Sequence, residues 1–292
     1  MNKKQTIKRL CVYIALSFLP VILIMVLIDC FVVYHLFTSD RAEIIYAVGI
    51  IGMLVPSIAH LLTRLITKEG FSNLYLMPNV KKHFGAYLAS VFVILGLSFT
   101  DVLVAWKTQF PQYSLGEVFH DVKGIPVIMF QIAMSIIMFF PAFGEEWGWR
   151  GYMMPKLTEL FGTPAAVIIG GIIWGLWHAP FTVNGHNFGV DYPGFPYMGI
   201  LYMCVFCTAM NAFLTLLTEK SKSIYPASFA HMLNNNVLGL VVISAFASED
   251  LLKDLEKMGN AKLAFGWGIV PTIMVGVVSF ILLCRMKSPK SH

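Results

Sequence analysis

Long apolar runs dominate this chain. Windows of about 20 mostly apolar residues, the length that crosses the hydrocarbon layer of a membrane, occur about eight times. They lie at 10–37, 43–66, 84–106, 125–145, 164–181, 196–217, 224–246 and 265–284. Because backbone polar groups inside a bilayer must find partners within the protein, such runs form helices. We therefore expect an all-α fold, a polytopic transmembrane helical bundle with about eight spans.

The composition agrees with this expectation. Apolar residues make up 57% of the chain and charged residues 13%, and the mean hydropathy is +0.72. Soluble globular proteins have about 25% charged residues, so this chain has too few charges to cover a surface that faces water. Neither a repeat nor a linker divides the sequence. We expect one membrane domain, 1–292, with core helices over 125–246.

The basic residues predict how the bundle is oriented. If the N-terminus is cytoplasmic, 15 lysines and arginines fall in segments on the inner side and 6 in segments on the outer side. Cytoplasmic loops carry the excess of these residues, so we expect both termini in the cytoplasm of a multi-pass protein of the cell membrane. We expect that membrane to be a bacterial plasma membrane. The net charge of +5 then reflects topology and gives no support for a nucleic-acid partner. No nucleotide-binding loop is present either.

Two adjacent glutamates, Glu145 and Glu146, end the fourth apolar run. Charged side chains at bilayer depth are costly and usually functional. On a helix that continues towards Leu160, Arg150 lies four residues after Glu146, at ion-pairing distance. Glu145 is rotated about 100° away from its neighbour. We expect Arg150 to support Glu146 and Glu145 to point into the bundle; capping or pairing of both glutamates at a helix end is the alternative.

Three further polar residues lie on two other apolar runs. His178 ends the run that follows a short turn after Phe161, so it belongs to a helix antiparallel to the one that carries Glu145. His231 and Asn235 are four residues apart and share one face of a later helix. Each group taken alone is compatible with an ordinary structural role. Together with Glu145 they form a set that is typical of hydrolysis.

The chemistry of this set leaves two mechanisms open. Glu145 can act as a general base towards water, with a histidine sharing the proton and with His231 and Asn235 donating to an oxyanion. Alternatively, Glu145, His178 and His231 can ligate zinc and leave one position for water. No HExxH motif is present to favour a metal. No GxSxG motif occurs either, which disfavours a serine triad.

These motifs resemble those of a known family. Glu145-Glu146-x-x-x-Arg150, Trp174-x-x-x-His178 and His231-x-x-x-Asn235 are similar to the three motifs of the CPBP family, which contains CAAX prenyl endopeptidases and bacterial Abi-type proteins. The resemblance covers about 145–236, and Trp174 stands where the pattern commonly has Phe.

The resemblance implies an intramembrane endopeptidase that cuts a membrane-embedded or membrane-anchored peptide or protein near the cytoplasmic side. It implies that Glu145 and His178 activate water and that His231 and Asn235 stabilise the oxyanion, with Glu146 and Arg150 in support. The family resemblance leaves metal dependence open between zinc and a metal-independent mechanism. A non-catalytic bacteriocin-immunity protein or membrane scaffold is the alternative function, and a proton-coupled transporter is a third.

Overall fold

The computed structural model describes residues 3–33, 41–120, 124–236, 245–258 and 269–286, and these segments contain helices and no β-strand. The elements are α1 (Lys3–Val33), α2 (Arg41–Gly52), α3 (Val55–Ile66), α4 (Phe84–Gln109), α5 (Leu115–Val118), α6 (Gly124–Gly148), a π-helical turn (Trp149–Met153), α7 (Met154–Phe161), α8 (Thr163–Trp177), α9 (Ala179–Thr182), α10 (Tyr197–Ser221), α11 (Tyr225–Asn236), α13 (Glu249–Met258) and α15 (Ile269–Arg285). The all-α expectation is confirmed for this part of the chain.

Six helical stretches are long and apolar enough to cross a membrane. They are Lys3–Cys30, Glu43–Ile66, Phe84–Gln109, Gly124–Phe161, Thr163–Thr182 and Tyr197–Ser221, and the shorter apolar helix Ile269–Arg285 follows. The fourth stretch continues past the paired glutamates to Phe161, as expected. The expected seventh span, 224–246, is described as a helix only to Asn236, and 237–244 lie outside the described residues. The chain is therefore a multi-pass membrane protein, and a count of about eight spans is compatible with its structure.

Two details differ from the expected spans. The first helix is described from Lys3, before the expected span that starts at residue 10, and in this added part Arg9 forms an ion pair with Glu69 at 3.5 Å. The second stretch is broken between α2 and α3. Pro56 stands in the first turn of α3, where it has no N–H to donate to the carbonyl four residues earlier, so the hydrogen-bond ladder of α2 cannot continue through it.

Helix α10 lies at the centre of the bundle. Of its apolar window 61% is buried, against 11% for the long stretch Gly124–Phe161. The outer face of α6 instead exposes large apolar side chains, among them Ile136 and Phe140. In a bilayer this face contacts lipid tails, so its apolar surface needs no protein partner.

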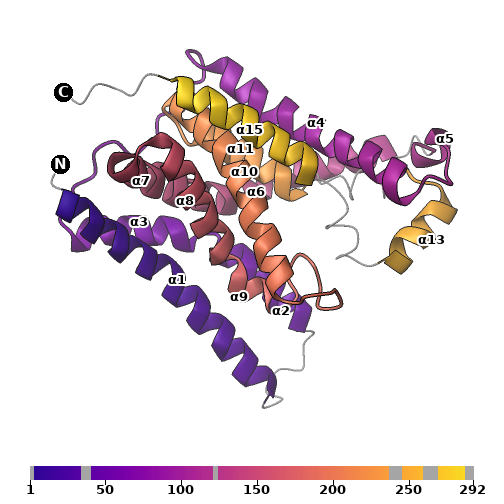
Figure 1. Cartoon of the computed structure of the whole chain (residues 1–292), viewed down its shortest axis with the longest axis horizontal. Helices are drawn as coiled ribbons and strands as arrows, with labels where there is room; N and C mark the ends of the chain where they lie inside the picture. The colour runs from indigo at the N-terminus through magenta and orange to yellow at the C-terminus, as the bar shows by residue number, and fades with distance from the viewer. Residues whose placement is uncertain (1–2, 34–40, 121–123, 237–244, 259–268, 287–292) are drawn as a thin grey trace.

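The helix ends gather at two opposite ends of the molecule. The start of α1 and the end of α15 lie on the same side in Figure 1, as expected for an even number of crossings. At this end, which we call the inner end after the side on which we expect the termini, the Ile224 amide donates to the Tyr75 carbonyl, and Thr6 Oγ1 donates to Glu159. At the other end α5 and α13 lie together (Figure 1), joined by the Tyr113 hydroxyl and Asp254.

A buried charge cluster closes the inner end. Glu69 binds Lys156, accepts a hydrogen bond from the Tyr152 hydroxyl at 2.7 Å and pairs with Arg9. Burial alone would raise the pKa of Glu69, but the hydrogen bonds from Lys156 and Tyr152 and the nearby charges of Lys156 and Arg64 lower it below its ordinary value. Glu69 lies between α3 and α4, Arg9 on α1 and Tyr152 in the π-helical turn. The ionised Glu69 carboxylate thus holds these three parts of the chain together.

Glycines let α8 approach α10 closely. A Cβ placed on Gly171 would lie 2.3 Å from Thr208 Cα, and one on Gly175 would lie 2.4 Å from Cys204 Cα. Small residues four apart on one helix face allow this kind of backbone contact in membranes. Because the clashing atoms belong to the backbone of α10, a side chain at either position would push the two helices apart.

The first prediction tests this contact. Gly171→Leu should lower the unfolding free energy by about 1–3 kcal/mol or more, because the new side chain overpacks the α8–α10 interface. Thermal unfolding in detergent measures the change. The matched control is Gly96→Leu on α4, where a Cβ meets no atom within 4 Å. Equal melting temperatures for the two variants would contradict the close contact.

The second prediction concerns the pH dependence of stability. Since the folded-state pKa of Glu69 is depressed from 4.5, its stabilising contribution is fully present above about pH 4.5 and is lost as the pH falls through the folded value. The difference in melting temperature between the native chain and Glu69→Gln should therefore shrink as the pH is lowered from about 7 to about 3. Glu219→Gln, in a partly exposed pair with Lys222, should change little at any pH. A Glu69→Gln difference that stays constant with pH would contradict the assignment.

Candidate active site

The paired glutamates lie directly before the π-helical turn. Their side chains are buried at 2% exposure for Glu145 and 0% for Glu146. Gly148 brings this part of the helix against α3, where a Cβ would meet Pro56 at 2.4 Å. Single π turns inside α-helices occur frequently at functional sites. Here the turn follows the two carboxylates and carries Arg150, which the sequence singled out, and Trp149, which it did not.

Glu146 is the member of the two that has an adjacent cation. Arg150 Nη1 donates to Glu146 Oε1 at 2.8 Å, so the predicted ion pair between residues four apart is present. His231 Nδ1 lies 2.8 Å from the same oxygen. Since a carboxylate accepts, this nitrogen carries the proton. Glu146 thereby joins α6 to α11 and fixes the orientation of the His231 ring, leaving Nε2 as its other ring nitrogen.

Glu145 has a different environment, made of neutral donors. Trp149 Nε1 donates to Glu145 Oε2 at 3.1 Å and Trp174 Nε1 donates to the same oxygen at 2.8 Å. Both bonds use one oxygen. Among the described residues no lysine or arginine forms an ion pair with Glu145. The carboxylate is thus oriented by two indole groups while its charge is not cancelled by an adjacent cation.

Trp174 lies beside both histidines and Arg150 as well as Glu145. Its ring centroid lies 5.5 Å from that of His231 and 6.0 Å from that of His178. The Arg150 guanidinium lies over the same ring, with Cζ at 4.1 Å from the centroid, an arrangement that favours cation–π attraction. The sequence indicated Trp174 only as an aromatic residue preceding His178. Its role as a donor to Glu145 depends on the rotation of α8, which the pattern does not give.

His178 caps the C-terminal end of α8. Its Nδ1 lies 2.9 Å from the Trp174 carbonyl oxygen, to which it donates. In His178, as in His231, the Nδ1 proton is donated to a fixed acceptor. Nε2 is therefore the nitrogen available to other partners in both rings. The neighbouring Trp177 donates its indole N–H to the Ser17 carbonyl at 3.0 Å. This bond ties the end of α8 to α1.

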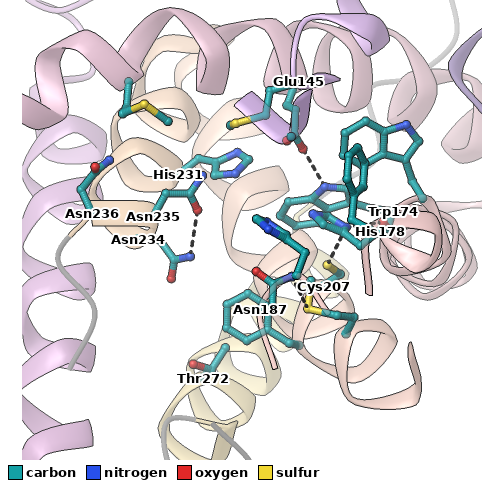
Figure 2. Close-up of a pocket in the computed structure, with 18 of the residues that line it drawn as sticks. Glu145, Trp174, His178, Asn187, Cys207, His231, Asn234, Asn235, Asn236 and Thr272 are labelled. Atoms are coloured by element: carbon teal, nitrogen blue, oxygen red, sulfur yellow. Dashed lines mark hydrogen bonds between the residues drawn. The ribbon is translucent and has the colours of Figure 1, made fainter. Parts of the chain in front are cut away.

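A cavity of about 570 Å³ joins these residues, and its wall includes Glu145, Trp174, His178, His231 and Asn235. Figure 2 shows Glu145 and Trp174 at one end of the residues drawn and Thr272 at the other. Glu146 and Arg150 do not line the cavity; they lie behind its wall. The structure therefore brings the predicted residues of three helices to one space, with the ion pair as their support.

Three consecutive asparagines at the end of α11 reach the cavity. Asn235 is an exposed side chain on the cavity wall and accepts from Asn234 Nδ2 at 3.5 Å. Asn234 and Asn236 line the same cavity (Figure 2). Of the three, the sequence singled out Asn235 alone.

Two cavity residues were missed by the sequence analysis. His186, in the segment that follows α9, lines the wall, and burial lowers its pKa. Asp101 on α4 lines it as well. A lone carboxylate inside the apolar run 84–106 was a signal for Asp101. No comparable signal marks His186, because histidines in polar loops are common.

The same geometry bears on the zinc alternative. Across the described residues, no group of three or more His, Cys, Asp or Glu side chains is arranged so that it could hold a metal ion. The bonds to Glu145 Oε2, His178 Nδ1 and His231 Nδ1 leave Glu145 Oε1 and both histidine Nε2 atoms for other partners. The three side chains therefore keep ligand atoms suited to zinc but are not gathered around one point in this arrangement.

Comparison with known proteins agrees with the position of this site. Residues 127–237 match the family described as type II CAAX prenyl endopeptidase Rce1-like. The chain is also similar to CAAX prenyl protease 2 of Methanococcus maripaludis, with 33% identity over 61 residues, which are 20% of this chain and 22% of that protein. The matched part is thus about a fifth of the length of this relative. The Rce1-like match contains α7, α8, α10, α11 and nearly all of α6, and so every residue of the predicted set. Over this segment the chain is similar to the type II CAAX prenyl endopeptidases, in line with the resemblance of its motifs to the CPBP family.

Proposed function

We propose that the chain is an intramembrane endopeptidase that hydrolyses a peptide bond of a membrane-associated substrate. One observation carries the proposal: a single cavity within the membrane bundle collects an unpaired carboxylate, two oriented histidines and an exposed carboxamide. The Rce1-like match over 127–237 supports a protease of the CAAX type. We further propose that 1–292 form one membrane domain in a bacterial plasma membrane, with the active site in the core helices 125–246.

In this proposal Glu145 is the general base. Its carboxylate removes a proton from a water molecule while the water oxygen bonds to the carbonyl carbon of the substrate. Two indole N–H groups keep the carboxylate in place without neutralising it as an adjacent lysine or arginine would. General-base catalysis of this kind contributes about 10²–10⁴-fold to a rate. The abstracted proton then passes to the leaving amine as the carbon–nitrogen bond breaks.

The two histidines take different parts because their fixed partners differ. His178 Nδ1 donates to a backbone carbonyl, so a neutral ring offers Nε2 as an acceptor that orients the water. His231 is held by the Glu146 carboxylate, so its Nε2, when protonated, donates to the oxyanion. Asn235 Nδ2 is the second donor. Preorganised donors of this type are worth about 3–4 kcal/mol each in soluble hydrolases.

The substrate class follows from the bilayer location. The catalytic carboxylate lies within an apolar span, so a peptide anchored in the membrane can present its bond at that depth. The printed names of the family and of the methanogen relative refer to CAAX prenyl proteins. A prenylated peptide is therefore the first substrate to test.

The third prediction tests the base. Glu145→Gln keeps the shape of the side chain and removes its basicity, so cleavage of a farnesylated, internally quenched peptide by the protein in liposomes should fall by about 10²–10⁴-fold. Glu219→Gln, on the partly exposed pair with Lys222, is the control and should keep full activity. Unchanged cleavage by correctly inserted Glu145→Gln would refute the proposal. A biological effect that survives in that variant would favour the non-catalytic immunity or scaffold alternative.

The fourth prediction separates positioning from packing. Trp174→Phe retains an aromatic ring but removes the N–H group that donates to Glu145. A misplaced catalytic group costs up to about 10²-fold, so kcat should fall by about that factor while KM changes little. Trp177→Phe is the matched control, because its indole lies on the same helix and the same cavity wall but donates to the Ser17 carbonyl. Equal loss of kcat in both variants would show a general packing effect instead.

A further inference from the structure

Asp101 is a carboxylate inside a membrane span that the proposed mechanism does not use. It lies on α4 in the stretch Phe84–Gln109. Ile94, Leu97, Ser98 and Asp101 all line the cavity, as expected for one helix face with residues three and four apart. A charged residue at this depth is costly and generally faces a partner or a ligand. Asp101 faces the same space as Glu145.

Asp101 has no partner of opposite charge in the described part of the protein. Its Oδ1 is buried and accepts no hydrogen bond, and the ion pairs of the described residues do not include it. The nearest lysine on its helix, Lys107, lies over the Trp106 ring with Nζ at 4.0 Å from the centroid. The side chain is therefore oriented towards the cavity with unused acceptor capacity.

The cavity wall as a whole is deficient in cations. Among the described residues the wall contains two carboxylates, Asp101 and Glu145, and no lysine or arginine; its other ionisable residues there are histidines, tyrosines and a cysteine. Walls of one charge sign in a low-dielectric setting concentrate ligands of the opposite sign. A cavity of this size is in the range that holds a drug-sized ligand, so it can take a short peptide segment with its side chains.

The two carboxylates come from different helices, Asp101 from α4 and Glu145 from α6. Glu145 and Trp174 lie at one end of the residues in Figure 2, and Thr272, from the start of α15, lies at the other. On α4 the lining residues advance from Ile94 to Asp101, towards the helix end that faces α5 and α13. Polar residues share this part of the wall, including Asn187 and Asn236. A ligand group that pairs with Asp101 would therefore bind the α4 wall, whereas the bond presented to Glu145 would lie at the α6 wall.

We propose that Asp101 forms a subsite for a lysine or arginine side chain of the peptide substrate, separate from the scissile bond. The proposal rests on the endopeptidase function and names a feature of its substrate. A cationic side chain would give the buried carboxylate the charge-assisted hydrogen bonds it lacks. It would also fix the register of the peptide relative to Glu145. A substrate with an apolar residue at that position would leave the charge unpaired.

Binding without cleavage tests the subsite directly. The probe is a farnesylated fluorescent peptide that carries one lysine, moved along the sequence, against the same peptide with norleucine. Binding to the full chain with Glu145→Gln in nanodiscs is followed by fluorescence anisotropy. At one position lysine should bind about 10–10²-fold more tightly, the range expected for a hydrogen bond to a charged group. Absence of a preference at every position would overturn the proposal.

A second substitution assigns the preference to Asp101. Adding Asp101→Asn, which keeps the shape and removes the charge, should abolish the lysine preference and leave norleucine affinity unchanged. Asp101→Lys should invert it in favour of a glutamate peptide. Thr100→Val is the control, since Thr100 is an exposed neighbour on α4 that does not line the cavity. A preference for the lysine peptide that persists in Asp101→Asn overturns the proposal. So does an Asp101→Asn protein that melts at a lower temperature and binds the lysine and norleucine peptides more weakly by the same factor.

The result is independent of the proposed activity. If the native chain cleaves no lysine peptide but the Glu145→Gln protein still binds it through Asp101, the endopeptidase function fails and the cationic subsite stands. If cleavage occurs with the same rate for lysine and norleucine peptides and with equal affinities, the subsite fails and the endopeptidase function stands.

Discussion

The Glu146 carboxylate and its two partners form the interaction on which the site depends. A charge within a bilayer span must be compensated locally, and Arg150 and His231 both bond to the same oxygen of Glu146. Arg150 comes from the π turn of the same long helix, whereas His231 comes from α11. One buried carboxylate thus fixes the turn, joins two helices and sets the proton position on a histidine ring. Removing one partner of such a buried ion pair is costly, because the other partner's charge stays buried without compensation.

Helix packing supplies the second requirement. Trp174 reaches Glu145 only because α8 sits deep in the bundle, and Gly171 and Gly175 allow it to lie against the backbone of α10. The bond from Trp177 to Ser17 and the charge cluster around Glu69 hold α1 and the inner end in place. Close packing and the indole bonds therefore act together. The glycines have no chemical role, yet the orientation of the base depends on them.

The helices and the contacts within a single helix were predictable from the sequence, because residues three to four apart lie on one face of a helix. Apolar windows predicted the helices, and residues four apart predicted both the Glu146–Arg150 pair and the shared face of His231 and Asn235. These relations are local to one helix. The bond from Trp174 to Glu145 is not local, because it depends on how α8 is rotated about its axis. The break between α2 and α3 and the π turn likewise depend on tertiary contacts, although Pro56 marked the first of them.

Adjacent carboxylates with opposite environments explain how one span can carry both support and chemistry. Glu146 has a cation beside it and lies behind the cavity wall, while Glu145 has two neutral donors and lies on the wall. A carboxylate whose charge is already matched by arginine is a poor base, because proton uptake would break that pair. Neutral indoles orient the group without that cost. The rotation of about 100° between successive helical residues separates the two environments, so the order Glu-Glu-x-x-x-Arg assigns support to the second glutamate and leaves the first for chemistry.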